Sequence, residues 1–311
     1  MSLKKISIIT PCFNEEENIE ELCQRIRETM AGIEDIDYEH ILIDNASTDG
    51  TVATLRTIIE QDKRVRVIVN TRNFGHIRSP YYGLLQAKGE AVISMASDLQ
   101  DPPELITDFI AKWREGYKVV LGIKAKSEET WIFFALRSLY YKVLHSLTDV
   151  ELIEHFTGFG LYDQEVIEIL RKMDDPYPYF RGLIADIGFP FAKIEFVQPL
   201  RKRGITKNNF YTLYDMAMLG MTSYTKVPLR LATMFGFGAA VISFLVGMFY
   251  LIYKLANWKN FTLGVAPLVV GFFFFGAVQL FFLGMLGEYI GAIYTQILHR
   301  PPVIEKERIN F

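Results

Sequence analysis

Two long uncharged stretches near the C-terminal end of the chain constrain its fold more than any other feature. Residues 231–253 contain no charged side chain, and a second uncharged run extends from residue 260 to residue 287. A helix over the first run is about 35 Å long, which covers a hydrocarbon core of about 30 Å with some tilt. Two buried core helices are the alternative, but soluble cores rarely contain two such runs. We therefore expect a transmembrane hairpin over residues 230–298.

Basic residues at the ends of these runs indicate the orientation of the hairpin. The outer ends are flanked by Lys226, Arg230, Arg300, Lys306 and Arg308, whereas the short connection contains Lys254 and Lys259. Lys and Arg are enriched on the cytoplasmic side of a membrane. The first residues include too few apolar positions before Pro11 to form a secretory signal. We expect an inner (cell) membrane protein with two membrane helices, whose catalytic domain and both termini are cytoplasmic.

The composition supports this expectation and excludes some classes of protein. Hydrophobic residues make up 50% of the 311 residues and aromatic residues 14%, which is more apolar than an ordinary soluble protein. The net charge of −3 does not indicate a nucleic-acid partner. Cys12 and Cys23 have no spacing typical of a zinc site or a disulfide framework, which fits a reducing cytosol.

The first 200 residues or so alternate between strand and helix patterns. We expect strands at 5–13, 38–47, 65–71 and 90–97, and helices at 14–30, 49–62 and 79–89. This alternation predicts an α/β fold with a parallel, doubly wound sheet. Ligands of such sheets bind at the carboxyl ends of the strands. Polar clusters at residues 11–15, 44–49 and 98–101 each follow a predicted strand, so we expect them to meet at one edge.

Each polar cluster also has a purely structural interpretation. Asn14 with Glu17 three residues later forms a capping box. Residues 44–51 are suited to a strand-to-helix turn, and Asp98 is suited to a solvated loop before the two prolines at 102 and 103. The recurrence of polar clusters after successive strands favours one shared ligand site over three unrelated structural features.

The ordered series of motifs resembles the nucleotide-sugar domain of glycosyltransferase family 2, whose members are inverting enzymes with the GT-A fold. The resemblance rests on TPCFNEEENI, IDNASTDGT, NFGHIRSPYYGLLQAKGE, SDLQDPPE, YFRGLIADIGF and RKRGITK, followed by SYTKVPLR and the hairpin. Within the family the chain is similar to the polyprenyl-phosphate glycosyltransferases, such as dolichyl-phosphate mannose synthase and the bactoprenyl glucosyltransferases. This implies transfer of a single sugar from a nucleotide sugar, with a UDP-sugar favoured over a GDP-sugar, to membrane polyprenyl (undecaprenyl) phosphate.

The resemblance also implies a division of the chain and a set of partners. We expect a GT-A domain over residues 1–206, an interfacial amphipathic segment over 207–229, the transmembrane hairpin over 230–298 and a cytosolic tail over 299–311. The expected partners are the nucleotide sugar, polyprenyl phosphate and the lipid bilayer. A homo-oligomer, tetrameric by resemblance, is a further expectation.

The family motifs assign roles to particular residues. The nucleotide-binding positions fall on Pro11, Asn14, Glu15, Asp44, Asn45 and Asn73. In the D-x-D-x-Q pattern, Asp98 and Gln100 fall on metal-ligand positions, whereas Ala96 falls on the first acid. Mg²⁺ or Mn²⁺ needs few protein ligands when phosphates and water complete its shell, so Asp98 helped by Gln100 is sufficient with the diphosphate. Asp101 is expected beside these ligands.

Two further positions depart from the family pattern. Asn45 stands where a second acid is frequent, so the resemblance gives Asp44 more of the contact with the base or ribose. Gly158 stands where many relatives have an acid that can act as a base. A phosphate monoester has a second pKa near 6 and is ionised at pH 7, so it needs no base. The missing acid therefore favours a phosphate acceptor over a hydroxyl acceptor.

Basic side chains are needed to neutralise both the donor diphosphate and the acceptor phosphate. The resemblance assigns Arg201 and Lys207 to a catalytic clamp over the donor diphosphate, although a basic segment before a membrane also suits anionic headgroups. Arg137 and Arg181 are expected at the acceptor phosphate. The five histidines lack metal-ligand spacing and are expected to be structural, with His76 nearest the expected donor site.

Two other functions remain open at this stage. A processive polysaccharide synthase shares the domain but normally has a Q-x-x-R-W motif and more membrane spans, neither of which occurs here. A degenerate, non-catalytic scaffold that binds nucleotide or lipid is suggested by the departures at Ala96, Asn45 and Gly158.

Overall fold

The structure is a computed structural model that describes residues 4–126, 153, 156–199, 210–257, 265–298 and 300–311. The strands are β1 (Lys4–Cys12), β2 (Ile36–Asp44), β3 (Val65–Asn70), β4 (Ala91–Ser94), β5 (Val119–Lys126), β6 (Phe156–Asp163), β7 (Phe191–Val197) and β8 (Glu305–Ile309). The domain helices are α1 (Ile19–Ala31), α2 (Thr51–Gln61), α3 (Gly75–Gln86), η1 (Pro103–Leu105), α4 (Ile106–Arg114), α6 (Gln164–Met173) and α7 (Phe180–Ile187). Three further helices lead into the hairpin, namely α8 (Phe210–Tyr224), α9 (Val227–Ala256) and α10 (Val265–Ile297).

The strands described here form one sheet in the order β7-β5-β6-β4-β1-β2-β3-β8. At its centre, β4, β1, β2 and β3 run parallel to one another. β6 runs antiparallel to both β4 and β5, and β8 runs antiparallel to β3. The predicted α/β class is confirmed, and the sheet is mixed because antiparallel strands extend its parallel centre on both sides.

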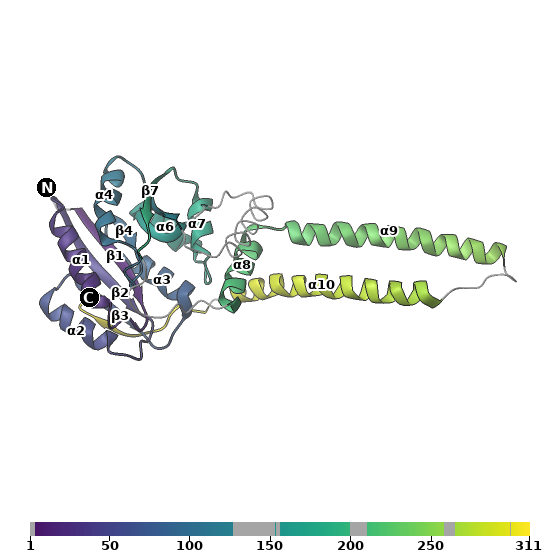
Figure 1. Ribbon diagram of the computed structural model, residues 1–311, viewed down its shortest axis with the longest axis horizontal. Helices are drawn as coiled ribbons and strands as arrows, with labels where there is room; N and C mark the ends of the chain where they lie inside the picture. Colours follow the sequence, from purple (N-terminus) through teal and green to yellow (C-terminus); the bar gives the residue numbers. More distant parts are fainter. Residues whose placement is uncertain (1–3, 127–152, 154–155, 200–209, 258–264, 299) are drawn as a thin grey trace.

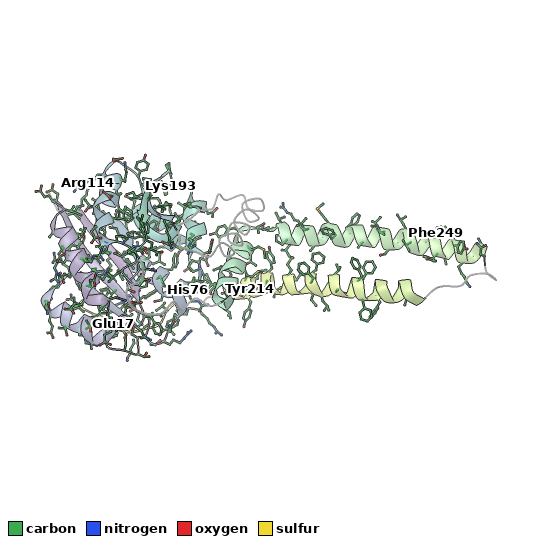
Figure 2. The ribbon with its side chains drawn as sticks, in the orientation of Figure 1. Glu17, His76, Arg114, Lys193, Tyr214 and Phe249 are labelled. Atoms are coloured by element: carbon green, nitrogen blue, oxygen red, sulfur yellow. The ribbon has the colours of Figure 1, made fainter. Side chains whose placement is uncertain are left out.

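The two predicted apolar helices project from the domain as a hairpin. α9 and α10 run beside each other away from the sheet, on the side opposite both chain termini (Figure 1). Their side chains do not pack into the domain, as Phe249 of α9 illustrates near the far end (Figure 2). Both helices are long and apolar enough to span a membrane, and only 0% and 6% of their most apolar windows are buried. Since core helices of a soluble protein are buried, this exposure favours lipid surroundings.

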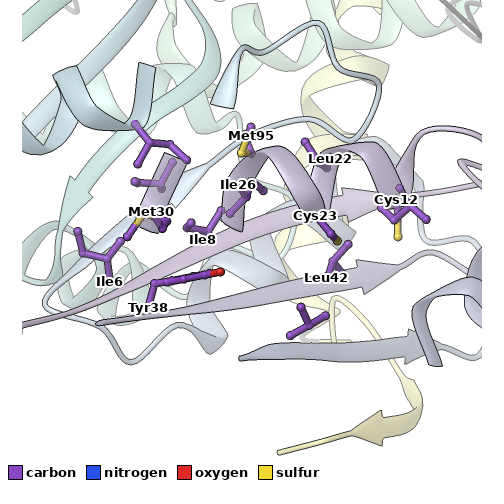
Figure 3. Close-up of a cluster of buried hydrophobic side chains, with 14 of the residues drawn as sticks. Ile6, Ile8, Cys12, Leu22, Cys23, Ile26, Met30, Tyr38, Leu42 and Met95 are labelled. Atoms are coloured by element: carbon purple, nitrogen blue, oxygen red, sulfur yellow. The ribbon is translucent and has the colours of Figure 1, made fainter. Parts of the chain in front are cut away.

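Helices cover both faces of the sheet. On one face, Ile6 and Ile8 of β1 pack with Leu22 and Ile26 of α1 in a cluster that also includes residues of α2 and α4 (Figure 3). On the other face, Ile9 of β1 belongs to a cluster with residues of α3, α6 and α7. Strands that are buried on both sides explain the continuous apolar runs of the sequence. This double coverage is the doubly wound arrangement that the sequence predicted.

The last residues of the chain form part of the sheet. β8 pairs with the edge strand β3, with Val67 opposite Ile309 and Val69 opposite Glu307. The Tyr82 hydroxyl of α3 donates a hydrogen bond of 2.7 Å to Glu305 Oε1. Residues 299–311, expected as a cytosolic tail, therefore include the strand that covers one edge of the domain.

The helix boundaries differ from the sequence expectation at two places. α1 begins at Ile19 rather than at residue 14, and it has no side-chain cap. The capping box of Asn14 and Glu17 is therefore wrong: Asn14 has a positive φ of 57°, outside the helix. α3 begins at Gly75, four residues before the predicted start at residue 79, so His76 belongs to its first turn.

Candidate active site

The turn after β1 is joined to the turn after β2. The Asn14 backbone N–H donates to Ser47 Oγ at 2.9 Å, and Asn14 Oδ1 accepts from the Thr48 N–H at 2.8 Å. The side chain of Asn14 thus bridges the two loops. The backbone of Asn14 is left-handed there, a conformation that Asn tolerates. The next residue continues the pattern, because the Glu15 N–H donates to Thr51 Oγ1 at 2.9 Å. Predicted nucleotide positions of β1 and β2 therefore lie side by side.

Asp44 is the last residue of β2 and is fully buried. Its carboxylate accepts hydrogen bonds from the N–H of Ser47, at 3.0 Å, and from the Ser47 hydroxyl. Burial raises the pKa of Asp44, and the hydrogen bonds from Ser47 oppose that shift. The carboxylate is held in a fixed position at the strand end, next to the Cys12 position of β1.

Asn45 joins the loop after β2 to the loop after β3. Its Nδ2 donates to Asn73 Oδ1 at 2.9 Å and to the Gly75 carbonyl at 3.1 Å. Its Oδ1 accepts from the Phe74 N–H at 2.9 Å and from Asn70 Nδ2 at 3.1 Å. These four bonds use the full capacity of an amide side chain. The side chain of Asn45 therefore positions the loop before α3 and has no capacity left for a nucleotide.

An acid at this position cannot make the same contacts. An ionised carboxylate has no donor for Asn73 Oδ1 or for the Gly75 carbonyl. The departure of Asn45 from the family acid is thus explained by the loop that it holds. Asn73 is tied into the same network, because its Oδ1 also accepts from the Gly75 N–H at 2.8 Å.

The turn after β4 holds the predicted metal ligands. Asp98 Oδ1 accepts from the Gln100 N–H at 3.2 Å, and Leu99 between them has a positive φ of 60°. The buried Asp101 closes the same turn, because its Oδ2 accepts from the Ala96 N–H at 2.8 Å. Burial, with a contribution from nearby Asp98, raises the pKa of Asp101 to about 7.

This turn fits a hard cation only when phosphate oxygens complete the coordination. In the part of the chain that the structure describes, no three His, Cys, Asp or Glu residues are grouped as a metal site. The turn instead presents the half-buried Asp98 carboxylate, and the sequence supplies a further side-chain oxygen at Gln100 and the buried carboxylate of Asp101. Oxygen is the ligand that Mg²⁺ prefers, and this ion usually takes few protein ligands.

A pocket of about 260 Å³ lies between these strand ends and the helices α3 and α7. Its walls come from the ends of β1 and β4, the first turns of α3, the start of β6 and the start of α7. The lining includes Pro11, His76, Ala96, Asp101, Gly158 and Arg181. The predicted acceptor residue Arg181 and the turn after β4 therefore border one cavity, the turn through Ala96 and Asp101 rather than through Asp98 and Gln100.

Gly158 contributes backbone but no side chain to this pocket. Its φ of 104° lies in a region that residues with a Cβ rarely adopt, although a Cβ there has space, with Phe180 Cδ1 at 3.8 Å. An acid at this position is therefore disfavoured by the backbone rather than by crowding. Asp101 is a carboxylate in the pocket, and its Oδ2 is bonded to the Ala96 N–H.

The pocket lies next to the junction between the domain and the hairpin. Tyr179 packs against Tyr224 of α8, with ring centroids 6.0 Å apart. α10 returns to the same place, where the Tyr289 hydroxyl donates to the Thr225 carbonyl at 2.8 Å. Gln296 of α10 donates to Asp175 Oδ1 at 2.9 Å. The membrane helices are thus attached beside the wall that carries Arg181.

Several predicted residues are not part of this description. Arg137, Arg201 and Lys207 lie outside the described residues, as does most of the aromatic segment around Arg137. Conversely, the structure brings Arg78 and Asp215 to the pocket region, and sequence reasoning did not select either. Arg78 directly follows the NFGHI run, which was the signal available for it.

The sequence is similar to that of known glycosyltransferases. A sequence model of Glycosyl transferase family 2 matches residues 7–170. A bactoprenol glucosyl transferase of Shigella phage SfV is 34% identical over 303 residues, which cover 97% of this chain and 98% of the phage protein. An uncharacterised glycosyltransferase of Synechocystis sp. is 32% identical over 303 residues, covering 96% and 93% of the two chains.

Similarity to solved structures is weaker. The mannosyltransferase PcManGT from Pyrobaculum calidifontis, in complex with GDP-Man and Mn²⁺, overlaps with 94% of this chain and 87% of its own. The two are 18% identical, with a TM-score of 0.46.

Proposed function

The chain belongs to glycosyltransferase family 2, and we propose that it transfers one sugar from a nucleoside-diphosphate sugar to a polyprenyl phosphate in the membrane. The observation that carries this proposal is the pocket of about 260 Å³, which borders the ends of β1 and β4 and, through Tyr179, the wall against which Tyr224 of α8 packs. The full-length similarity to a bactoprenol glucosyl transferase supports the lipid acceptor.

The donor is proposed to bind at the carboxyl ends of β1, β2 and β4. Asp44, with its carboxylate fixed by Ser47, suits a hydrogen bond to the base or ribose, and the turns around Asn14 and Glu15 border the same edge. Asp98 and Gln100 would hold Mg²⁺ or Mn²⁺ together with the diphosphate. Such an ion supplies positive charge that stabilises the leaving diphosphate.

The reaction needs no base from the protein. An oxygen of the lipid phosphate attacks the anomeric carbon of the sugar from the face opposite the leaving group. The new carbon–oxygen bond forms while the bond to the donor diphosphate breaks, and nucleoside diphosphate leaves with the electron pair. The acceptor is already ionised at pH 7, which agrees with the absence of an acid at Gly158. The configuration at the anomeric carbon is inverted.

Basic groups are proposed to neutralise the phosphates on both sides of the pocket. Arg181 borders the pocket and suits the acceptor phosphate, together with Arg137. Arg201 and Lys207 are proposed as the clamp that stabilises charge developing on the leaving group. A UDP-sugar is the proposed donor, with a GDP-sugar as the alternative.

The membrane arrangement follows from the attachment of the hairpin. Both the start of α9 and the end of α10 meet at Thr225 and Tyr289, and β8 returns to the sheet. Both termini therefore belong on the same side of the bilayer as the catalytic domain. With the basic residues at the outer ends, we propose the cytoplasmic side of the cell membrane.

A donor screen tests this function directly. Purified full-length protein is incubated with undecaprenyl phosphate, Mg²⁺ or Mn²⁺, and a panel of UDP- and GDP-sugars, and the lipid products are analysed by mass spectrometry. We expect one donor to give a lipid with one sugar and one phosphate, and chelation of the metal to abolish the product. Binding of nucleotide and lipid without any transfer would contradict the proposal and identify a non-catalytic scaffold. Chains of several sugars would identify a processive synthase.

A further inference from the structure

The first turn of α3 carries two basic side chains beside the pocket that the proposed reaction does not yet use. His76 lines the pocket together with Arg181. Arg78, two residues later, is not one of the lining residues, and its guanidinium carbon lies 5.1 Å from the centroid of the Tyr177 ring. Tyr177 directly precedes Pro178, which also lines the pocket. We refer to His76, Arg78 and Arg181 as the basic rim.

The basic rim has unused capacity to bind an anion. In the described part of the chain, Arg181 and His76 make no hydrogen bond or ion pair, and Arg78 contacts only the Tyr177 ring. The Nε atom of Arg78 is buried without a hydrogen-bond partner. A buried, unpaired donor of a charged group costs free energy unless a ligand satisfies it. Arg78 is the member of the basic rim with such a buried donor, and His76 and Arg181 add two side chains at the pocket wall that can donate hydrogen bonds to an anion.

The backbone of α3 adds to the same field. α3 has no acidic residue in its first turn and no side-chain cap. The unsatisfied N–H groups of a helix N-terminus carry partial positive charge and favour anions. The Asn45 network fixes this end of the helix through Phe74 and Gly75. His76 and Arg78 therefore lie in a helix turn that is held in place by hydrogen bonds, rather than in a free loop.

The side of the pocket on which the rim lies indicates which anion it receives. His76 is at the end of the domain that faces the hairpin, close to Tyr214 of α8 (Figure 2). Asp215, the next residue of α8, acts electrostatically on both His76 and Tyr177. Under the proposed function, a lipid phosphate approaches the domain from the side of the hairpin, whereas the donor binds at the ends of β1 and β4, whose Pro11 and Ala96 also line the pocket.

We propose that His76 and Arg78 bind the phosphate of the lipid acceptor together with Arg181. This inference deepens the proposed function and rests on it. The rim discriminates between a lipid that ends in a phosphate monoester and one that ends in an alcohol, because only the phosphate offers several charged oxygens that pair with the two guanidinium groups. His76 and Arg78 are positioning residues that hold the attacking oxygen and take no proton from it.

The test compares variants of the rim with a matched control from the same loop. His76→Gln and Arg78→Gln are made in the full-length protein, beside Arg72→Gln as the control. Arg72 is exposed, packs on Phe74 at 4.0 Å and does not line the pocket. We expect each rim variant to raise the KM for undecaprenyl phosphate about tenfold, as expected for one charge-assisted hydrogen bond. The KM for the nucleotide sugar and kcat at saturating lipid should remain at the values of the control.

Equilibrium binding separates this inference from the proposed function. The proteins are titrated with vesicles that contain undecaprenyl phosphate, undecaprenol or phosphatidylglycerol. We expect wild-type protein to prefer undecaprenyl phosphate, and the rim variants to lose that preference even if no sugar donor is active. Three results would overturn the inference: unchanged lipid KM and binding, a raised KM for the nucleotide sugar, or an equal loss of binding to phosphatidylglycerol vesicles. If transfer fails but the wild-type preference is present and lost in the variants, the proposed function fails and the inference stands.

Discussion

The carboxyl ends of the parallel strands and the hairpin are stabilised by different surroundings. At the strand ends, side chains are saturated by partners from the same chain, as the four bonds of Asn45 show. In the hairpin, large apolar side chains have almost no partner, and Phe237 and Phe272 are 74% and 73% exposed. The polar groups at the strand ends therefore find their partners within the chain, whereas the apolar side chains of the hairpin need lipid around them. Donor chemistry should therefore depend on the strand ends, and delivery of the acceptor on the hairpin.

Removal of the proposed metal ligand at the strand ends should lower the rate of transfer more than any other change. We expect Asp98→Ala to lower kcat by on the order of 100-fold or more, since the charge on the leaving diphosphate is no longer neutralised. The free energy of unfolding should change little because Asp98 is only partly buried. The measurement is lipid-product formation at saturating substrates, with the exposed Asp108→Ala as control. Near-normal turnover of Asp98→Ala would remove Asp98 from the site.

Replacing the hairpin should separate the two regions. Thr225 and Tyr289 are in contact, at 2.8 Å, so a short Gly/Ser linker can replace residues 227–288 while β8 is kept. We expect nucleotide-sugar binding to be unchanged and transfer to undecaprenyl phosphate in vesicles to fall by roughly tenfold or more, because the domain is no longer concentrated at the membrane. Product formation and isothermal titration with the nucleotide measure the two effects.

The control for this variant is a truncation after Lys226. The truncation also removes β8, which leaves the edge of β3 uncovered and removes the bond between Tyr82 and Glu305. It should therefore lose stability as well as lipid transfer. Equal transfer rates for the linker variant and the full chain in vesicles would show that the hairpin does not deliver the acceptor.

Changing Asn45 tests whether the strand-end loops are held by the chain itself. Asn45→Asp removes two donated hydrogen bonds and sets a buried carboxylate against Asn73 Oδ1 and the Gly75 carbonyl. We expect the free energy of unfolding to fall by about 2–4 kcal/mol, measured by urea denaturation in detergent. Asn14→Asp is the matched control, since its half-buried side chain keeps the accepted bond from Thr48 and the change should cost less than about 1 kcal/mol. Unchanged stability with a raised KM for the donor would mean that Asn45 contacts the nucleotide.

The core beneath the strand ends should have its own pH dependence. Burial lowers the pKa of His40 to about 3, whereas the unfolded chain takes up the proton near the ordinary value of 6.5. Stability should therefore be full above pH 6.5 and be lost as the pH falls toward 3, by up to about 1.4 kcal/mol per pH unit. His40→Gln keeps a polar partner for Thr10 and should flatten this slope. Parallel slopes for the two proteins between pH 6 and pH 4 would contradict a neutral, buried His40.

Local patterns were enough to predict much of the fold. The uncharged runs predicted α9 and α10, and the alternating pattern predicted the four parallel strands, because both signals come from residues adjacent in sequence. β8 was missed because its sequence, EKERI, is mostly charged and becomes a strand only by pairing with β3. The capping box failed for the same kind of reason, since Asn14 is bonded to Thr48, a residue 34 positions away.

Only those parts of the site that belong to a recognisable sequence motif could be predicted. The polar clusters at residues 11–15, 44–49 and 98–101 were expected at one edge. The structure joins the first two through the bond between Asn14 and Ser47, and Pro11 and Asp101 of the first and third line one pocket. The role of Asn45 could not be read from its motif, because its side-chain partners lie between the end of β3 at Asn70 and the start of α3 at Gly75, and none is within 20 residues. His76 was expected to be structural, yet its exposed side chain lines the pocket because α3 begins earlier than predicted.

The choice of acceptor tests directly whether the protein transfers sugar to a lipid phosphate without a base of its own. Full-length protein with its best donor is offered undecaprenyl phosphate and undecaprenol in matched vesicles over a pH series, and the products are analysed by mass spectrometry and NMR. Our account predicts a product with one sugar, one phosphate and an inverted anomeric configuration from the phosphate, a rate that falls below about pH 6 as the monoester takes up its second proton, and almost no product from the alcohol. Comparable glycosylation of undecaprenol would contradict it, because the protein would then have to supply a base.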